Sequence, residues 1–197
     1  MSTLAAKSYH HGELRTALVG AALALLTEGG ADALSLRAVA RRAGVSAMAP
    51  YRHYPDKEAL LAAVAVQGFD GLRDVLRAAD VAAAAGDALV AQAVAYVRYA
   101  EENPALFRLM FGPARLGTHP ALEAAGEAAY AVLAARVAAQ TPTDADREAC
   151  ALGCWSMVHG LASLFLDGRI GDKTPAPRDG LTRRIAAAML AAPLDAR

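Results

Sequence analysis

The chain reads SLRAVARRAGVS at residues 35–46 and YRHYPDKEAL at residues 51–60. Ser35 is a favourable helix N-cap, and the apolar residues after it recur every three to four positions. This spacing predicts a short amphipathic helix whose arginines face solvent. Gly44 is expected to end that helix in a tight turn, because glycine adopts the backbone conformations that such turns need.

A second short helix is expected after the turn, from residue 47 to about residue 53. Ser46 is placed to cap it, and Pro55 breaks it. A longer helix, from about Gly12 to Glu28, precedes both and stops at a pair of glycines. Three helices in this order form a helix-turn-helix unit that reads DNA, or a plain three-helix packing unit. Spacing alone favours the two equally.

The whole chain is predicted to be all-α, with about nine helices. Hydrophobic residues make up 55% of it and aromatic residues only 6%, so Ala, Leu and Val must supply a closely packed helical core. Asp56 is expected to open a long fourth helix that reaches about residue 80 and bridges into the rest of the chain. Asp87 is a candidate cap for the fifth helix, and Pro104 ends it. The remaining helices are expected at residues 106–111, 120–140, 143–171 and 181–192.

Charge is distributed unevenly along a chain whose net charge is zero. Residues 1–57 hold seven basic and four acidic side chains, a net charge of +3, and the remainder carries −3. A basic segment on an acidic body is typical of a DNA-binding head. Cys150 and Cys154 lie one helical turn apart and favour a reducing cytoplasm over a disulfide framework. No apolar segment is expected to be long enough to span a membrane.

The two quoted segments resemble the DNA-binding signature of the TetR family, over about residues 9–60. YHHGEL at residues 9–14 and WSMVHG at residues 155–160 resemble the subset whose C-terminal domain is named for a Trp-His-Gly segment. The resemblance implies a three-helix DNA-binding domain at residues 1–57, which includes the start of the fourth helix. Residues 58–197 would then form a helical ligand-binding and dimerisation domain.

The function implied by the resemblance is sequence-specific regulation of transcription. A cytoplasmic homodimer would repress genes from a palindromic operator in double-stranded DNA, and a small-molecule effector would release it. The resemblance implies no enzymatic activity, no cofactor, no metal and no membrane.

The resemblance also implies which side chains touch DNA. Phosphate contacts are implied for Ser35, Ser46, Tyr51, His53 and Lys57. Base contacts are implied for Ala47, Met48 and Arg52, of which the arginine can bind a guanine edge. Arg37 is expected to reach DNA, whereas Arg41 and Arg42 are interpreted as a solvated cationic face. Pro50 departs from the bulky aliphatic residue of the family pattern. At the fourth helical position it would remove only the earliest hydrogen bond, so the helix is expected to tolerate it.

A ligand pocket is implied in the C-terminal part. Its candidate walls are Phe69, Tyr96, Tyr99, Phe107, Met110, Phe111, Trp155 and His159. Each of these residues can equally be an ordinary core residue.

Two alternatives from other functional classes remain. One is a redox sensor built on Cys150, Cys154 and His159. A reactive cysteine needs a nearby cation or helix N-terminus, and apolar neighbours in the middle of a helix act in the opposite direction. A metal site from these residues with His119 would need further ligands. The other alternative is an architectural DNA-binding protein without a ligand, which loss of DNA binding on addition of a ligand would exclude.

Overall fold

Eight α-helices make up the described part of the chain, which comprises residues 11–84, 86–112, 116, 119–140, 144–170 and 175–191 of a computed structural model. In chain order they are α1 (His11–Gly29), α2 (Leu36–Arg42), α3 (Lys57–Ala82), α4 (Ala88–Glu102), α5 (Pro104–Phe111), α6 (Pro120–Gln140), α7 (Asp144–Leu166) and α8 (Pro175–Ala191). Two 3₁₀ turns, η1 (Ala31–Ala33) and η2 (Pro50–Arg52), lie before and after α2. These ranges contain no strand, and the predicted all-α class is confirmed. Residues 1–10, which include the start of the YHHGEL segment, lie outside them.

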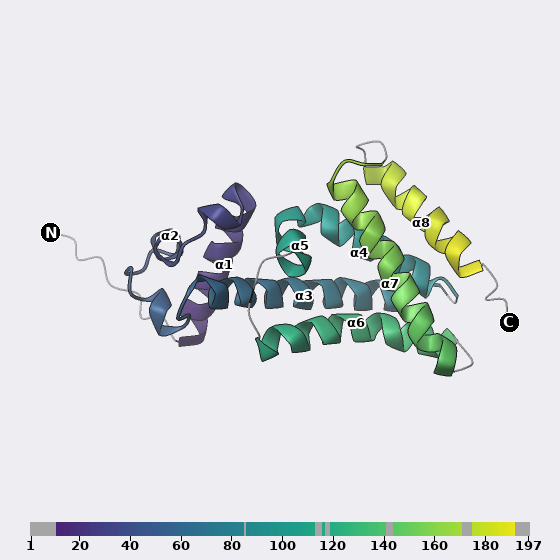
Figure 1. The fold of residues 1–197 in the computed structure, drawn as a ribbon, viewed down its shortest axis with the longest axis horizontal. Coiled ribbons are helices and arrows are strands. Elements are labelled where there is room, and N and C mark those ends of the chain that lie inside the picture. Colours follow the sequence, from purple (N-terminus) through teal and green to yellow (C-terminus); the bar gives the residue numbers. More distant parts are fainter. Residues whose placement is uncertain are drawn as a thin grey trace.

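The N-terminal lobe consists of α1, η1, α2 and η2, packed around the start of α3 (Figure 1). Two caps hold its helices as predicted. Ser35 Oγ accepts a hydrogen bond from the N–H of Ala38 at 3.1 Å, and Asp56 Oδ1 accepts one from the N–H of Ala59 at 2.8 Å. Each cap satisfies an N–H that has no partner inside its own helix. The predicted starts of α2 and α3 are therefore confirmed.

Residues 47–53 do not form the predicted α-helix. Only the three residues of η2 are helical, and Ser46 does not cap them, since Ala49 occupies the cap position. Pro50 has no N–H to donate to the carbonyl of Ser46. That carbonyl accepts the N–H of Ala49 instead, at 2.9 Å, which closes a tighter turn one residue early. The expectation that this proline would leave the helix intact was wrong, and for this reason the structure has one helix fewer than predicted.

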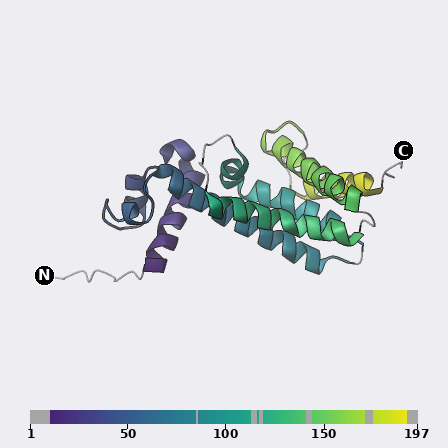
Figure 2. The same ribbon diagram turned by 60° about the horizontal axis from the view of Figure 1, so that its bottom comes forward.

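α3 is the spine that the two lobes share (Figures 1 and 2). It begins in the N-terminal lobe and runs for 26 residues to the far end of the C-terminal lobe. α6 lies along it, and α4 and α5 pack against it as well. α7 and α8 form an outer layer against α4. Because both lobes contain part of α3, a displacement of this helix in the C-terminal lobe would also move its first residues in the N-terminal lobe.

α7 is unusually apolar for a helix that lies in an outer layer. Its segment Asp146–Leu166 is long and apolar enough to cross a membrane by length and composition, so the expectation that no segment reaches that length was wrong. One side of α7 is buried in the fold, through Val158, Leu161 and Phe165. The other side exposes large apolar residues, namely Leu152, Trp155 and Leu164. The described residues of one chain thus leave these large apolar side chains of α7 uncovered.

The start of α8 and the cap of α4 also differ from prediction. α8 begins at Pro175, ahead of the predicted start at Leu181. Proline is compatible with the first turn of a helix, because the N–H groups there have no intrahelical partner. α4 begins beside Asp87 as expected, but that side chain makes no cap hydrogen bond. Pro104 separates α4 from α5 as predicted and occupies the first turn of α5.

Candidate functional site

The first candidate site is the outer surface of α2 and η2. Seven of the nine residues expected to contact DNA are exposed there: Ser35, Arg37, Ser46, Ala47, Met48, Tyr51 and Arg52. His53 and Lys57 are half-buried beside them. The structure thus places all nine on the N-terminal lobe.

Buried neighbours on either side fix the orientation of η2. Pro50 and Tyr54 are both buried, and Tyr54 is only 2% exposed. Because these two anchors face the core of the lobe, the intervening Tyr51 and Arg52 must face outward. Tyr51 is 43% exposed and Met48 is 67% exposed, although both are large and apolar enough to favour burial. The segment from Met48 to Arg52, which includes η2, therefore presents a thioether, an aromatic ring and a guanidinium at the surface.

The turn between α2 and η2 depends on a glycine. Gly44 has a φ of +70°, which L side chains rarely adopt. After it, the N–H of Val45 donates to the carbonyl of Ala40 at 3.0 Å and closes the end of α2. The chain can then reverse and bring η2 against α2, as the sequence predicted for this turn.

Two cations of the lobe make intramolecular contacts. Arg42 of α2 forms a bidentate ion pair with Glu28 of α1, at 2.5 and 2.7 Å, and its hydrogen bonds lower the pKa of Glu28. Arg42 is thus held by α1 rather than simply solvated. Lys57 Nζ donates to the carbonyl of Ala31 at 2.7 Å, so its ammonium is positioned against η1.

The second candidate site is an apolar cavity of about 700 Å³ in the C-terminal lobe. α3, α4, α5, α6, α7 and α8 all contribute to its lining. Its volume lies within the range of small-molecule sites, roughly 300–1,000 Å³. The lining is dominated by aliphatic and aromatic side chains, and the cavity can therefore hold a mainly apolar molecule.

Four of the eight residues expected at a ligand pocket line this cavity: Phe69, Tyr96, Phe111 and Trp155. The other four, Tyr99, Phe107, Met110 and His159, do not line it. Phe107 and Met110 are buried core residues of α5. The ring of His159 stacks on that of Phe107, with centroids 5.4 Å apart.

His159 does not line the cavity but hydrogen-bonds to Tyr96, a residue that does. Its Nδ1 lies 2.9 Å from the hydroxyl of Tyr96, and the imidazole tautomer decides which of them donates. Burial raises the pKa of Tyr96 and lowers that of His159, so both groups are neutral at pH 7. The hydrogen bond with His159 therefore positions Tyr96 in the cavity wall, and neither residue adds charge to the cavity.

Sequence reasoning missed a polar network at the far end of α3. Asp80 accepts hydrogen bonds from Arg136 of α6, at 2.7 and 2.5 Å, and from Gln92 Nε2 of α4, at 2.7 Å. The guanidinium of Arg136 is the main reason that the pKa of Asp80 is lowered. Gln92 is 2% exposed and lines the cavity, and its Oε1 has no hydrogen-bond partner among the described residues. The single glutamine within the apolar stripe of α4 was the sequence feature that could have indicated this buried polar network.

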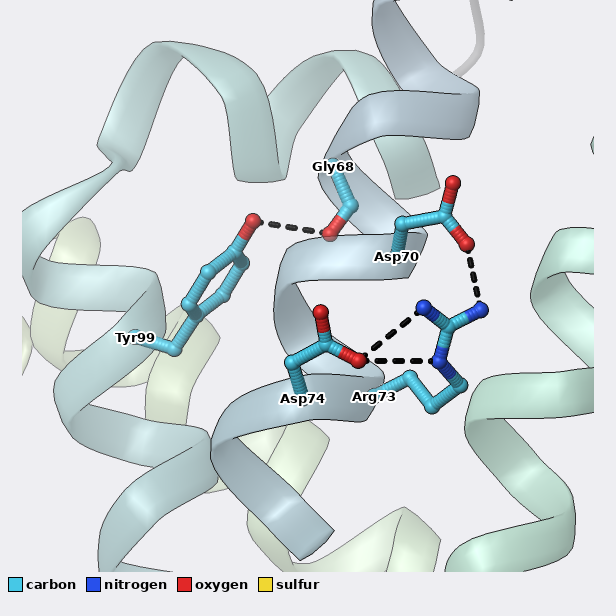
Figure 3. Close-up of polar contacts among 5 residues, drawn as sticks. All are labelled: Gly68, Asp70, Arg73, Asp74 and Tyr99. Carbon is cyan, nitrogen blue, oxygen red and sulfur yellow. Dashed lines mark hydrogen bonds and ion pairs between the residues drawn. The ribbon is translucent and has the colours of Figure 1, made fainter. Parts of the chain in front are cut away.

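The middle of α3 makes a different contact on each side (Figure 3). On one side the Tyr99 hydroxyl donates to the carbonyl of Gly68 at 2.7 Å, and burial raises the pKa of Tyr99 to about 12. On the other side Arg73 lies between Asp70 and Asp74, with N–O distances of 2.6 and 2.9 Å. Tyr99 thus links α4 to the spine and does not face the cavity.

The two cysteines lie in the cavity wall and are free thiols. Burial raises the pKa of Cys154, and the neighbouring Cys150 contributes in the same direction. A nucleophilic or redox-sensing thiol requires the opposite shift, because the thiolate is the reactive form. Among the residues that the structure describes, no three metal-ligating side chains come together. The environment of the thiols therefore favours a packing role.

Comparison with protein families adds independent evidence. Residues 18–64 match the family described as bacterial regulatory proteins, tetR family, and residues 89–189 match the one described as tetracyclin repressor-like, C-terminal domain. The chain belongs to the TetR family. It is a transcription regulator with an N-terminal DNA-binding domain, and the family's members are not enzymes. The C-terminal match agrees with the Trp-His-Gly subset inferred from residues 155–160.

Several relatives share most of this TetR-family chain. An uncharacterized HTH-type transcriptional regulator of Mycobacterium tuberculosis is 28% identical over 176 residues, covering 89% of this chain and 81% of the relative. The structure of a protein with unknown function from Rhodococcus sp. RHA1 is 35% identical, with a TM-score of 0.79, covering 93% of this chain and 96% of that one. A tetR-family transcriptional regulator from Streptomyces coelicolor is 25% identical, with a TM-score of 0.73 and coverages of 93% and 81%.

Proposed function

We propose that this regulator is a cytoplasmic homodimer that represses transcription from a palindromic operator and leaves it when a small molecule enters the cavity. The observation that best supports DNA binding is that Tyr51 and Arg52 are exposed to solvent between the buried residues Pro50 and Tyr54. A surface that presents these side chains to solvent on a lobe of net positive charge fits the phosphates and base edges of a DNA groove.

The exposed residues divide into two roles in this proposal. Ser35, Ser46, Tyr51, His53 and Lys57 bind phosphates, and Arg37 adds a cation nearby. Ala47, Met48 and Arg52 meet base edges, where the guanidinium can bind a guanine and the apolar side chains can contact a thymine methyl. Because η2 is a short 3₁₀ turn, fewer side chains can enter the groove than from a full recognition helix. Residues 1–57 form the DNA-binding domain and residues 58–197 the ligand-binding and dimerisation domain.

The exposed apolar side chains of α7 and α8 support dimerisation. Five large ones lie on these two helices, namely Leu152, Trp155, Leu164, Met189 and Leu190. Apolar surface concentrated on two adjacent helices is typical of an interface between subunits. Pairing through them would place two N-terminal lobes on one operator, separated by about one turn of DNA or slightly more.

α3 provides the proposed coupling between ligand and DNA. Phe69, Leu72 and Leu76 on its C-terminal half line the cavity, while Lys57 at its start belongs to the DNA-facing lobe. A ligand that fits one position of α3 better than another changes the distance between the two lobes of the dimer. Release of DNA follows only from this difference in affinity.

The first experiment is selection of random duplex DNA by the purified protein at near-physiological salt, with sequencing of the bound pool. Enrichment of a palindrome is expected. Recovery of unselected DNA, or of none, would reject the proposal and favour the architectural or redox alternative.

Variants of the N-terminal lobe then test the assigned contacts on the selected operator. Lys57→Gln removes a charge but keeps an N–H donor for the Ala31 carbonyl, so the slope of log affinity against log salt should fall by about one per lost phosphate contact. Tyr51→Phe should lower operator affinity by loss of its hydroxyl. The control is Arg77→Gln, since Arg77 is exposed on α3 outside the N-terminal lobe. Unchanged affinity and salt slope in both test variants would refute the assigned phosphate contacts.

A further inference from the structure

We propose that the cavity selects an organic cation, an ammonium-bearing molecule with a large apolar part, over a carboxylate of the same size. This proposal rests on the proposed function in taking the cavity as the effector site. It concerns only the chemistry of the ligand, and it can be measured without DNA.

The charge of the cavity wall is the first observation. Of the described residues that line the cavity, Glu127 of α6 is the only Asp or Glu and none is Lys, Arg or His; Glu127 is exposed. The nearest guanidinium in the Gln92 network, that of Arg136, is already paired with Asp80 through two hydrogen bonds. A carboxylate that entered this cavity would lose its hydration and meet no cation, which opposes its binding.

The polar groups of the wall point to the same charge. Gln92 must turn its Nε2 toward the carboxylate of Asp80, because an acid without its proton can only accept. Its Oε1 is left as a buried acceptor without a partner. Glu127 adds a second acceptor with negative charge. An ammonium or amide N–H of a ligand can satisfy either acceptor, and a carboxylate can satisfy neither.

Aromatic rings beside Glu127 strengthen the preference. Tyr130 lies on α6 close to Glu127 in the sequence, and its ring packs on that of Trp155 with centroids 5.7 Å apart. Both rings line the cavity. The face of an electron-rich ring attracts a cation, and the attraction grows where water is excluded. Glu127 and these two rings all line the cavity, and Glu127 and Tyr130 lie three residues apart on α6, so in this proposal they receive the cationic end of the ligand.

The remaining lining suits an alkyl or ring system. Leu72, Leu76 and Leu133 contribute aliphatic surface from α3 and α6. A volume of about 700 Å³ accommodates a molecule much larger than the ammonium group alone. The expected ligand therefore carries its charge at one end and buries the rest.

The test uses four probes that share one tail and differ in the head group: decylammonium, decyltrimethylammonium, decanol and decanoate. Trp155 is the chain's single tryptophan and lines the cavity, so its fluorescence reports occupancy directly. The full-length protein is titrated at pH 7, below the micelle concentration of each probe. Both ammonium probes should bind at least tenfold more tightly than decanoate.

Glu127→Gln is the decisive variant, because it removes the charge of an exposed side chain and keeps its size. It should weaken binding of the two ammonium probes by about threefold to tenfold and leave decanol binding unchanged. Glu123→Gln is the matched control, since Glu123 is exposed on α6 one turn earlier and does not line the cavity. It should change none of the four affinities.

Three results would overturn the proposal: decanoate binding as tightly as the ammonium probes, no saturable fluorescence change with either ammonium probe, or an ammonium affinity that Glu127→Gln leaves unchanged. The same experiments distinguish failure of this inference from failure of the proposed regulatory function. A protein that prefers cations but selects no palindromic DNA overturns the proposed function alone, and one that selects a palindrome but binds decanoate best overturns this inference alone.

Discussion

Gly68 is the point on the spine where a single added methyl group should do most damage. A Cβ at this position would lie 2.6 Å from Met110 Sδ, 2.9 Å from Met110 Cγ and 3.1 Å from Leu106 Cδ1. Both neighbours belong to α5 and are buried, so neither can move without disturbing the core. Gly68→Ala therefore requires the Met110 and Leu106 side chains to shift within the packed interface of α3 and α5.

The expected magnitude is a difference between opposing effects. Alanine in place of glycine inside a helix stabilises it by about 1 kcal/mol. Overpacking a well-filled core typically costs about 1–3 kcal/mol. Any shift of α3 at this position also strains the 2.7 Å hydrogen bond from Tyr99 to the Gly68 carbonyl, which is worth about 1 kcal/mol. We expect Gly68→Ala to lower the free energy of unfolding by about 1–2 kcal/mol.

Urea denaturation followed by circular dichroism measures this difference, at one fixed protein concentration because a dimer's stability depends on it. Gly20→Ala is the control. Gly20 is exposed within α1, and a Cβ there would meet nothing within 4 Å, so the same substitution should stabilise by up to about 1 kcal/mol. A Gly68→Ala protein as stable as the wild type, or more stable, would refute the close-packing argument.

Three further substitutions test buried polar groups, each by the free energy of unfolding. Tyr54→Phe should cost nothing and can stabilise by up to about 1 kcal/mol, because the buried Tyr54 hydroxyl has no partner among the described residues; a clear loss would reveal a missed partner. Tyr99→Phe should cost about 1 kcal/mol through loss of its bond to Gly68, and a neutral result would contradict that bond. Asp80 has a pKa lowered from 3.8, so its contribution is present above that pH and is lost as the pH falls through the lowered value. Asp80→Asn should destabilise at pH 7 and flatten the acid dependence below about pH 4, and an unchanged pH profile would exclude this role.

The sequence was sufficient for features that depend on a few neighbouring residues. The caps at Ser35 and Asp56, the glycine turn at Gly44 and the break at Pro104 each follow from local backbone chemistry. Composition likewise predicted the all-α class. The residues expected at the DNA interface gather on one lobe because most of them lie within a short segment of chain.

Features that depend on packing between distant helices were not predictable in the same way. The cavity wall at Gln92 and Glu127 comes from two helices whose mutual placement no local pattern encodes. Tyr99 and His159 looked like pocket residues but hydrogen-bond to Gly68 and Tyr96 instead. The prediction of an α-helix at residues 47–53 failed for a local reason. The sequence showed that Pro50 has no N–H, but the predicted helix is so short that loss of this one hydrogen bond removes most of its helical hydrogen bonding.

The positions of Trp155, Met189 and Leu190 connect the two proposals made for the C-terminal lobe. All three line the cavity, and all three are also exposed on α7 and α8, the helices proposed to pair between subunits. A side chain that contacts a ligand on one side and the partner subunit on the other cannot change rotamer for one without affecting the other. Under the proposed pairing, ligand binding therefore acts on the spacing of the DNA-binding lobes by two routes, through α3 within a subunit and through this shared wall between subunits. Substitution of Met189 by alanine should then alter both dimer affinity and decylammonium affinity, whereas Leu164→Ala, on the exposed face but outside the cavity lining, should alter the dimer alone.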